Sequence, residues 1–168
     1  MNIILIGFMC SGKSSVAARL SEISGYRLFD TDRMIEQTYK KTVQDVFIQY
    51  GEEFFRKAEY GALKTALAGD NRVIATGGGA LTSPETAELI NLSGVKVYLK
   101  ITPQTAKSRN DGGRPLLANL TDKQLNDLFF AREKLYQSAA DLTVNAENDS
   151  PEVLAEKIYQ IIIKGEKN

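Results

Sequence analysis

The sequence contains no histidine, which removes the side chain that most often serves as a general acid–base or a transition-metal ligand. It has a single cysteine, Cys10, so no disulfide can form within the chain, and a reducing compartment is indicated. Basic and acidic residues balance at 21 each, so no net charge attracts nucleic acid or an anionic membrane. No run approaches the roughly 18 apolar residues needed to cross a bilayer, and no signal-peptide pattern is present. We therefore expect a cytoplasmic protein with no nucleic-acid or membrane partner.

What is present is typical of one globular domain over residues 1–168, with 43% hydrophobic and 25% charged residues. Short apolar runs predict strands at 2–6, 26–29, 72–75, 95–101 and 142–144. Amphipathic segments predict helices at 13–24, 32–39, 43–50, 53–68, 84–91, 103–108, 122–140 and 151–164. This alternation predicts an α/β domain with a mainly parallel sheet and a ligand site beyond the carboxyl ends of its strands.

Residues 7–14 form a phosphate-binding pattern directly after the first strand, and we call them the phosphate loop. Gly7 and Gly12 bound it, Cys10 and Ser11 lie inside it, and Lys13, Ser14 and Ser15 open the helix that follows. Loop N–H groups and the positive end of that helix can bind phosphates. We expect Lys13 to face solvent and reach the β/γ-phosphates, and Ser14 to ligand magnesium. The alternative is a chance glycine loop.

Two aspartates, Asp30 and Asp32, follow the second predicted strand at a spacing that can place both on one side of an extended segment. One carboxylate could then support a metal ion while the other faces an acceptor hydroxyl. The alternative is that Asp30 or Thr31 only caps the next helix.

Three consecutive glycines, Gly77, Gly78 and Gly79, end the third predicted strand. Such a run contributes no side-chain packing, so it favours a backbone that approaches a ligand and offers it N–H donors. A tight surface turn is the alternative.

Arg56, Arg114 and Arg132 supply positive charge that could bind a carboxylate or phosphate, although residue type alone does not single them out. Arg114 lies in the aperiodic stretch 110–121. That stretch is either a mobile functional segment or an ordinary surface connection.

Together these motifs resemble the shikimate kinases, members of the nucleoside-monophosphate-kinase-like P-loop group. The resemblance is colinear over nearly the whole chain. It rests on the phosphate loop, Phe29-Asp30-Thr31-Asp32, Gly51-Glu52 with Phe55-Arg56 and Glu59, the three glycines, Arg114-Pro115-Leu116-Leu117, and Arg132 with Tyr136. In the family, the position of Cys10 is usually a further glycine.

The resemblance implies a five-stranded parallel sheet of order 2-3-1-4-5, a substrate-binding region near residues 32–60 and a mobile lid near 109–121. It implies ATP-dependent phosphorylation of the 3-hydroxyl of shikimate to shikimate 3-phosphate, on the route to chorismate and the aromatic amino acids. The partners it implies are ATP, shikimate and Mg²⁺. No heptad repeat in the sequence indicates an obligate dimer, so we expect a monomer.

The same resemblance implies residue roles. Asp32 would contact the accepting hydroxyl, and Asp30 would support Mg²⁺ together with Ser14. Arg56 and Arg132 would bind the substrate carboxylate while the glycine run, Gly77 to Gly79, contacts the ring hydroxyls. Arg114 would enter with the lid onto the transferring phosphoryl group. Arg109 and Pro151 would cover the two faces of adenine.

Two other function classes stay open at this point. One is a P-loop kinase of another small molecule, such as gluconate or a nucleoside monophosphate. The other is a nucleotide-dependent switch or binding module, although the Asn-Lys-x-Asp motif expected of a GTPase does not occur in the sequence.

Overall fold

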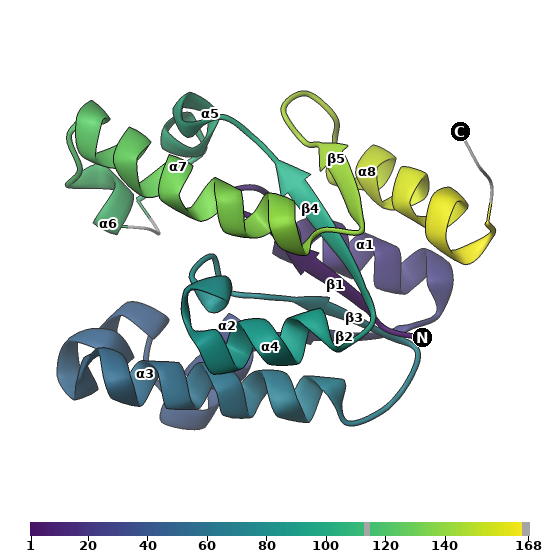
Figure 1. Cartoon of the computed structure of the whole chain (residues 1–168), viewed down its shortest axis with the longest axis horizontal. Coiled ribbons are helices and arrows are strands. Elements are labelled where there is room, and N and C mark those ends of the chain that lie inside the picture. The colour runs from purple at the N-terminus through teal and green to yellow at the C-terminus, as the bar shows by residue number, and fades with distance from the viewer. Residues whose placement is uncertain (113–114, 166–168) are drawn as a thin grey trace.

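The computed structural model describes residues 1–112 and 115–165, with the side chains of 115 and 116 left out of the description. Its centre is a parallel sheet of order β2-β3-β1-β4-β5, as the resemblance implies. The strands are β1 (Ile3–Ile6), β2 (Arg27–Asp30), β3 (Arg72–Ala75), β4 (Val95–Lys100) and β5 (Leu142–Asn145). The predicted α/β class and sheet order are therefore confirmed (Figure 1).

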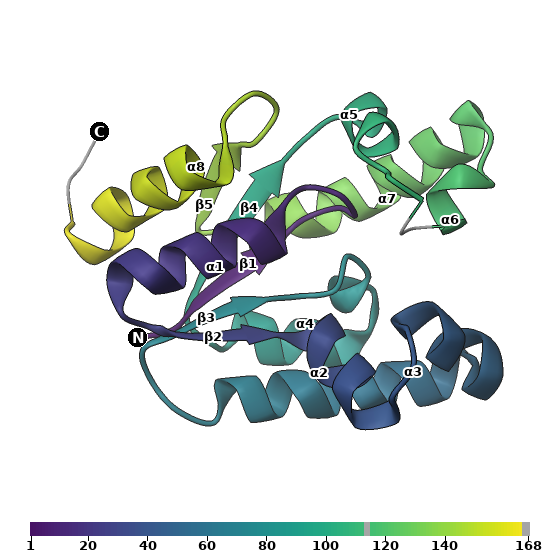
Figure 2. The ribbon, with the colours of Figure 1, turned by 180° about the vertical axis from the view of Figure 1, so that it is seen from behind.

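Helices cover both faces of this sheet. They are α1 (Lys13–Ser24), α2 (Thr31–Tyr39), α3 (Val43–Leu67), α4 (Pro84–Asn91), α5 (Pro103–Ser108), α6 (Pro115–Ala118), α7 (Asp122–Ala139) and α8 (Pro151–Ile158). Figures 1 and 2 show α1 and α8 on one face and α4 and α7 on the other, with α2 packed on α3. Within the described residues, no helix is long and apolar enough to span a bilayer.

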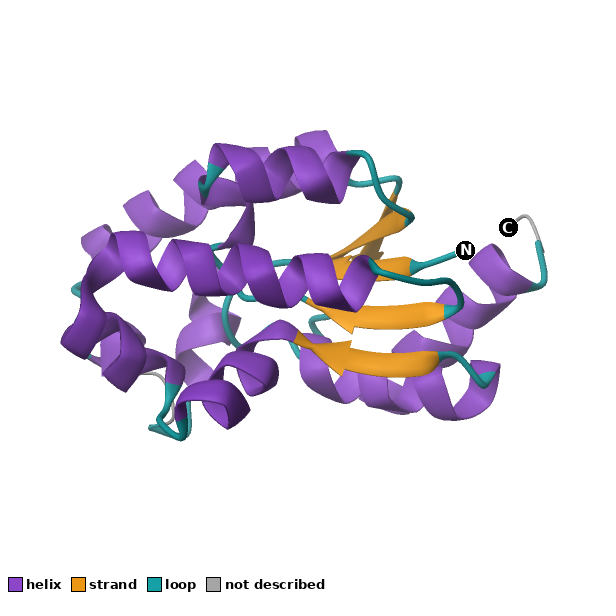
Figure 3. Ribbon diagram, turned by 90° about the horizontal axis from the view of Figure 1, so that it is seen from below, coloured by secondary structure: helices purple, strands orange, loops and turns teal. Residues whose placement is uncertain are grey.

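The central strand is the most apolar one, and its position follows from burial. All four residues of β1, Ile3–Ile6, are buried because the sheet is covered on both faces. At one edge of the sheet, β2 begins with the exposed Arg27. Figure 3 shows the strands pointing the same way, so the carboxyl ends of all the strands lie together, at what we call the carboxyl edge of the sheet. Ligand sites of open α/β sheets form beyond this carboxyl edge.

The structure departs from the sequence-based prediction in four places. The helices expected at 43–50 and 53–68 form one element, α3, interrupted where Gly51 takes non-helical backbone angles (φ 85°, ψ 172°). The expected irregular stretch 110–121 contains the short helix α6. A short 3-10 helix, Ala80–Thr82, follows the three glycines. After α8 the chain continues as a π-helical turn, Tyr159–Ile163. Gly113 and Arg114 lie outside the described residues.

Candidate active site

The phosphate loop connects β1 to α1 at the carboxyl edge of the sheet. Gly7 has φ +147°, and a Cβ there would lie 2.8 Å from the carbonyl oxygen of Leu99, so only glycine fits. Gly12 precedes α1 in a left-handed conformation and provides no side-chain cap. The first N–H groups of α1 are therefore not capped by a side chain at that position, which is the arrangement that binds phosphate.

Lys13 does not face solvent, so that expectation is wrong. Its side chain is buried, and Nζ donates to the carbonyl oxygens of Gly7 and Phe8 at 2.8 Å each and to Ser11 Oγ at 3.3 Å. A buried ammonium group needs such partners because leaving it unpaired is costly. Lys13 thus stabilises the phosphate loop through hydrogen bonds and also gives it a positive charge.

Cys10 takes a left-handed backbone conformation with φ 62°. A side chain is strained there, whereas glycine is not. This accounts physically for the glycine usual at this position in the resembled family, and Cys10 adopts the same conformation with a side chain.

Ser14 and Asp30 meet beneath the loop. Ser14 Oγ donates to Asp30 Oδ2 at 2.5 Å, and Asp30 Oδ1 accepts from the backbone N–H of Arg33 at 3.1 Å. Asp30 is therefore the N-cap of α2 and also the partner of Ser14, so both interpretations of this residue apply. A hydroxyl and a carboxylate are hard oxygen ligands, and Mg²⁺ commonly takes one or two carboxylates alongside substrate phosphates. The pair fits that ion.

A cleft of about 210 Å³ brings the separate motifs together. Both aspartates line it alongside Gly78. Its other lining residues are Met9, Cys10, Gly12, Lys13, Ser14, Ser15, Thr76 and Asp111. Asp32, in the first turn of α2, therefore faces the same space as the phosphate loop.

The three glycines are enclosed by the site itself. A Cβ on Gly77 would lie 2.8 Å from both Asp32 Oδ1 and Glu59 Oε1. One on Gly78 would lie 3.1 Å from Met9 Cγ, and one on Gly79 would lie 3.0 Å from Arg56 Nη1. None of the three has a positive φ, so close approach explains the run and conformational freedom does not.

Some backbone groups of the glycine run bind other protein groups, and others are left for a ligand in the cleft. The N–H of Gly77 donates to Thr31 Oγ1 at 3.1 Å, and the N–H of Ala80 donates to the carbonyl of Gly77 at 3.1 Å. Within the part of the chain that the structure describes, the N–H groups of Gly78 and Gly79 donate to no protein acceptor. Two adjacent donors are thus left for a ligand.

Arg56 lies against the glycine run and is oriented by Glu59. Its Nη1 donates to Glu59 Oε2 at 2.9 Å and to the carbonyl of Gly79 at 3.3 Å. Glu59 is 1% exposed, and this burial raises its pKa against the opposing effect of the Arg56 charge. Glu52 adds a second, exposed carboxylate at 3.5 Å from Nη2.

Arg132, on α7, approaches the same region from the opposite side. Its guanidinium lies 5.9 Å from the centre of the Phe8 ring, and its buried Nε has no acceptor among the described residues. Its charge is felt by both Glu59 and Tyr136, because it lowers the pKa of each against burial. Arg56 and Arg132 thus come from different helices, α3 and α7, and the charges of both act on the buried Glu59 carboxylate beside the glycine run.

Arg109 and Pro151 border one loop, the connection from β5 to α8. Arg109 Nη2 donates to the carbonyls of Ala146 and Glu147 at 2.8 and 2.7 Å. The Glu147 carboxylate accepts from the N–H of Thr102 and the hydroxyl of Thr105. Hydrogen bonds therefore connect both ends of α5 to the loop that precedes α8, and Pro151 is the first residue of α8.

Several residues of the site were not among the predicted site residues. Glu59 carried a signal, since a carboxylate three residues after Arg56 on a helix can pair with it. Thr31 and Tyr136 stand in the motifs that carry the resemblance, but their contacts with Gly77 and Gly78 were not predicted, because these partners are remote in sequence. Glu147 carried no signal in the sequence for the same reason.

A phosphate loop at the carboxyl edge of a 2-3-1-4-5 sheet, facing paired aspartates and an arginine-lined glycine run, defines a P-loop kinase of a small acceptor. The shikimate kinase family model matches residues 9–163. The chain belongs to the shikimate kinase family.

Individual relatives agree with this assignment. The shikimate kinase of Symbiobacterium thermophilum is 38% identical, covering 99% of both chains. That of Dehalococcoides mccartyi is 38% identical, covering 98% of this chain and 95% of the relative. The structure of a shikimate kinase from Acinetobacter baumannii in complex with shikimate matches with a TM-score of 0.90 and 33% identity, covering 99% of this chain and 95% of that one. A deoxyadenosine kinase from M. mycoides, with a TM-score of 0.66 and 22% identity, shares the fold.

Proposed function

We propose that the chain catalyses the ATP-dependent phosphorylation of shikimate, in the shikimate pathway, with the residues that line its cleft. The observation that carries this proposal is the convergence of Lys13, Ser14, Asp30, Asp32 and Gly78 on one cleft. Phosphoryl transfer needs positioning and neutralisation of charge more than covalent help from the protein. The cleft offers both.

At the phosphate end, the N–H groups of α1 and the ammonium of Lys13 bind the nucleotide phosphates. Lys13 Nζ then exchanges its carbonyl acceptors, those of Gly7 and Phe8, for phosphate oxygens. This exchange replaces neutral acceptors with charged ones and strengthens the hydrogen bonds.

Ser14 and Asp30 would hold Mg²⁺, which their short hydrogen bond between two oxygen ligands supports. Held there, the ion would supply positive charge to neutralise the transferring phosphoryl group.

At the acceptor end, Arg56 and Arg132 bind the carboxylate of shikimate, and Gly78 and Gly79 donate to its hydroxyls. Gly77 also lies beside the substrate, but its N–H already donates to Thr31 Oγ1 and does not donate to a ligand. Asp32 accepts the proton of the attacking hydroxyl, since its carboxylate borders both the phosphate loop and the glycine run. The substrate-binding region thus spans α2 and the first half of α3, near residues 32–60.

Arg109 and Pro151 cover adenine, which their position on either side of the loop from β5 to α8 supports. The role expected of Arg114 and of a lid near 109–121 stays a prediction, because Arg114 lies outside the described residues.

A coupled assay that compares phosphate transfer from ATP to shikimate, gluconate and AMP tests the proposal. Shikimate should be the acceptor that supports turnover. Transfer to gluconate or AMP with none to shikimate would refute the assignment, and ATP binding without transfer to any acceptor would favour a binding module.

We further propose a cytoplasmic monomer. The single cysteine, half-buried in the phosphate loop, supports a reducing compartment. Light scattering on the purified protein measures the oligomeric state directly, and a stable dimer would contradict the monomer.

A further inference from the structure

Two buried tyrosines lie side by side, and one of them contacts the glycine run. Tyr98, on β4, and Tyr136, on α7, have ring centres 5.3 Å apart. They are 0% and 2% exposed, and burial raises the pKa of both hydroxyls. Each therefore stays protonated and can donate a hydrogen bond at any physiological pH.

The two hydroxyls differ in what they bind. The hydroxyl of Tyr136 donates to the carbonyl oxygen of Gly78, 58 residues away in the sequence. The buried hydroxyl of Tyr98 has no hydrogen-bond partner among the described residues. Two neighbouring buried tyrosines thus differ in one respect: the Tyr136 hydroxyl makes a hydrogen bond, and the Tyr98 hydroxyl makes none with the described residues.

The carbonyl that Tyr136 binds belongs to the same peptide unit as the N–H of Gly79. A peptide unit is planar and trans, so its carbonyl and its N–H point in opposite directions. Fixing the carbonyl of Gly78 toward α7 therefore fixes the direction of the Gly79 N–H. Other hydrogen bonds hold the carbonyls of Gly77 and Gly79, so the bond from Tyr136 is the one that fixes this peptide unit between two residues that lack a Cβ.

Tyr136 also fixes where α7 lies relative to the glycine run. Arg132 precedes it by four residues and so lies on the same face of the helix. The Arg132 charge lowers the pKa of the Tyr136 hydroxyl against the effect of burial, in keeping with that shared face. One hydroxyl thus links the peptide that carries a donor to the helix that carries a guanidinium.

We propose that Tyr136 is a positioning residue of the acceptor site, acting through the Gly78 carbonyl. It sets the spacing and direction of the Gly79 N–H and the Arg132 guanidinium, which a small hydroxylated carboxylate contacts together. This inference rests on the proposed function, because it takes shikimate as that carboxylate.

The experiment compares Tyr136→Phe with Tyr98→Phe, two substitutions that each delete one buried hydroxyl and keep the ring. Tyr136→Phe leaves a buried carbonyl without its donor, so we expect KM for shikimate to rise about tenfold while KM for ATP stays within about twofold. Tyr98→Phe removes a hydroxyl that binds no group in the described part of the chain, and it should leave both KM values unchanged. Calorimetric titration with shikimate should show the same difference in affinity.

A spectroscopic readout separates positioning from general stability. In ¹H–¹⁵N spectra the amide resonance of Gly79 should move in Tyr136→Phe and stay in place in Tyr98→Phe. A wild-type shikimate KM together with an unmoved Gly79 resonance in Tyr136→Phe would overturn the proposal. Equal losses for ATP and shikimate, accompanied by a lower Tm, would overturn it too, because they indicate a structural role. If the unmodified protein transfers no phosphate to shikimate, the proposed function fails, and the Gly79 resonance still tests the tyrosine contact.

Discussion

The phosphate end and the acceptor end of the cleft are held together over very different distances along the chain. Lys13 closes the phosphate loop through acceptors 6, 5 and 2 residues away. At the acceptor end, hydrogen bonds join Gly77 to Thr31 across 46 residues and Gly78 to Tyr136 across 58. The first region is a local motif, whereas tertiary packing assembles the second.

This difference predicts how each end responds to substitution. At the phosphate end, the side chain that organises the loop is also the one expected to contact phosphate. At the acceptor end, Glu59, Thr31 and Tyr136 bind groups that we expect to contact the substrate, namely Arg56 and the glycine backbone. Changes there should weaken binding of one substrate and leave the other alone.

The largest effect is expected for Lys13→Met, which keeps the length of the side chain and removes its charge. Turnover should fall about 10³-fold or more, because the phosphates lose a buried cation. The Tm should fall as well, since the carbonyls of Gly7 and Phe8 lose their donor. A coupled assay and thermal unfolding measure the two effects. Wild-type turnover in this variant would contradict the nucleotide site.

Asp32→Asn tests the point where the two ends meet. The amide keeps the shape of the side chain but cannot take the hydroxyl proton, so kcat should fall by roughly 10²–10⁴ with little change in KM for shikimate. The exposed Asp45, at the start of α3, provides a matched control, and Asp45→Asn should leave kcat unchanged. A loss confined to ATP binding would instead place Asp32 with the metal ion.

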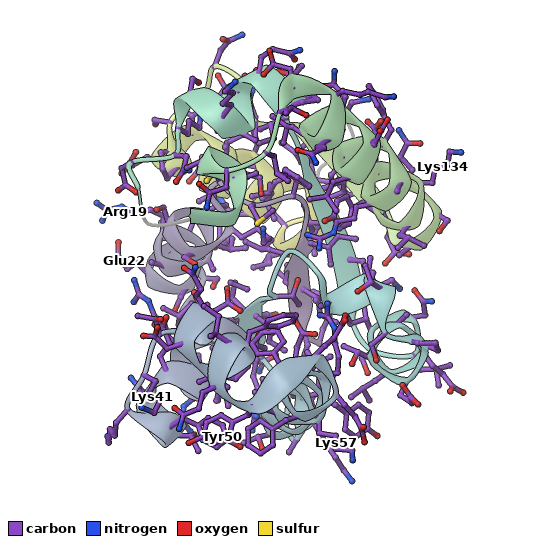
Figure 4. The ribbon with its side chains drawn as sticks, turned by 90° about the vertical axis from the view of Figure 1, so that its left-hand side faces the viewer. Arg19, Glu22, Lys41, Tyr50, Lys57 and Lys134 are labelled. Carbon is purple, nitrogen blue, oxygen red and sulfur yellow. The ribbon has the colours of Figure 1, made fainter. Side chains whose placement is uncertain are left out.

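Arg56→Ala and Arg132→Ala should each weaken shikimate binding and leave ATP binding nearly unchanged. Loss of a charge-assisted hydrogen bond to the substrate corresponds to about 1.5–3 kcal/mol. Arg19→Ala is the control for shikimate binding, because Arg19 pairs with Glu22 on α1 (Figure 4) and with Glu152 on α8 and does not line the cleft. Separate calorimetric titrations with each ligand measure the split. Equal losses of affinity for shikimate and for ATP would contradict the distinction between the acceptor end and the phosphate end of the cleft.

Glu59→Gln should separate binding from stability. KM for shikimate should rise severalfold, because Arg56 loses the carboxylate that orients it. Burial raises the pKa of Glu59 in the folded protein, so the wild type loses stability as pH rises from the unfolded value toward the folded one. The stability advantage of the glutamine variant should therefore be absent below about pH 4.5 and grow as pH rises. Denaturant unfolding at several pH values checks this, and a constant difference would contradict the raised pKa.

The smallest effect is expected one residue from Arg56. Lys57 pairs with Glu53 on the solvent side of α3 and points away from the cleft (Figure 4). Such exposed pairs contribute little. Lys57→Ala should leave Tm and both KM values at the wild-type level, and a rise in KM for shikimate would extend the acceptor end onto the outer face of α3.

Most elements were predictable because their signals are local. Helices α1, α4 and α5 and strand β3 begin and end where predicted, and Gly51 interrupts α3 between the two helices expected there. The burial of Lys13 was not predictable from residue type, since a lysine in a loop usually faces solvent and only the folded loop offers carbonyls to its ammonium. Helix α6 was missed because a single turn has too few residues to show periodicity.

By itself the sequence determined the alternation of strands and helices that predicts a parallel α/β sheet, the phosphate loop, the paired aspartates and the glycine run, because each of these signals is read from residues adjacent in the chain. The tertiary structure decided which groups complete the site. It placed Glu59 on Arg56, Thr31 on Gly77 and Tyr136 on Gly78. Among residues 1–112 and 115–165 it left the N–H groups of Gly78 and Gly79 without a protein acceptor. Hydrogen bonds are directional and short, so partners dozens of residues apart are selected when the helices pack and cannot be read from their spacing in the chain.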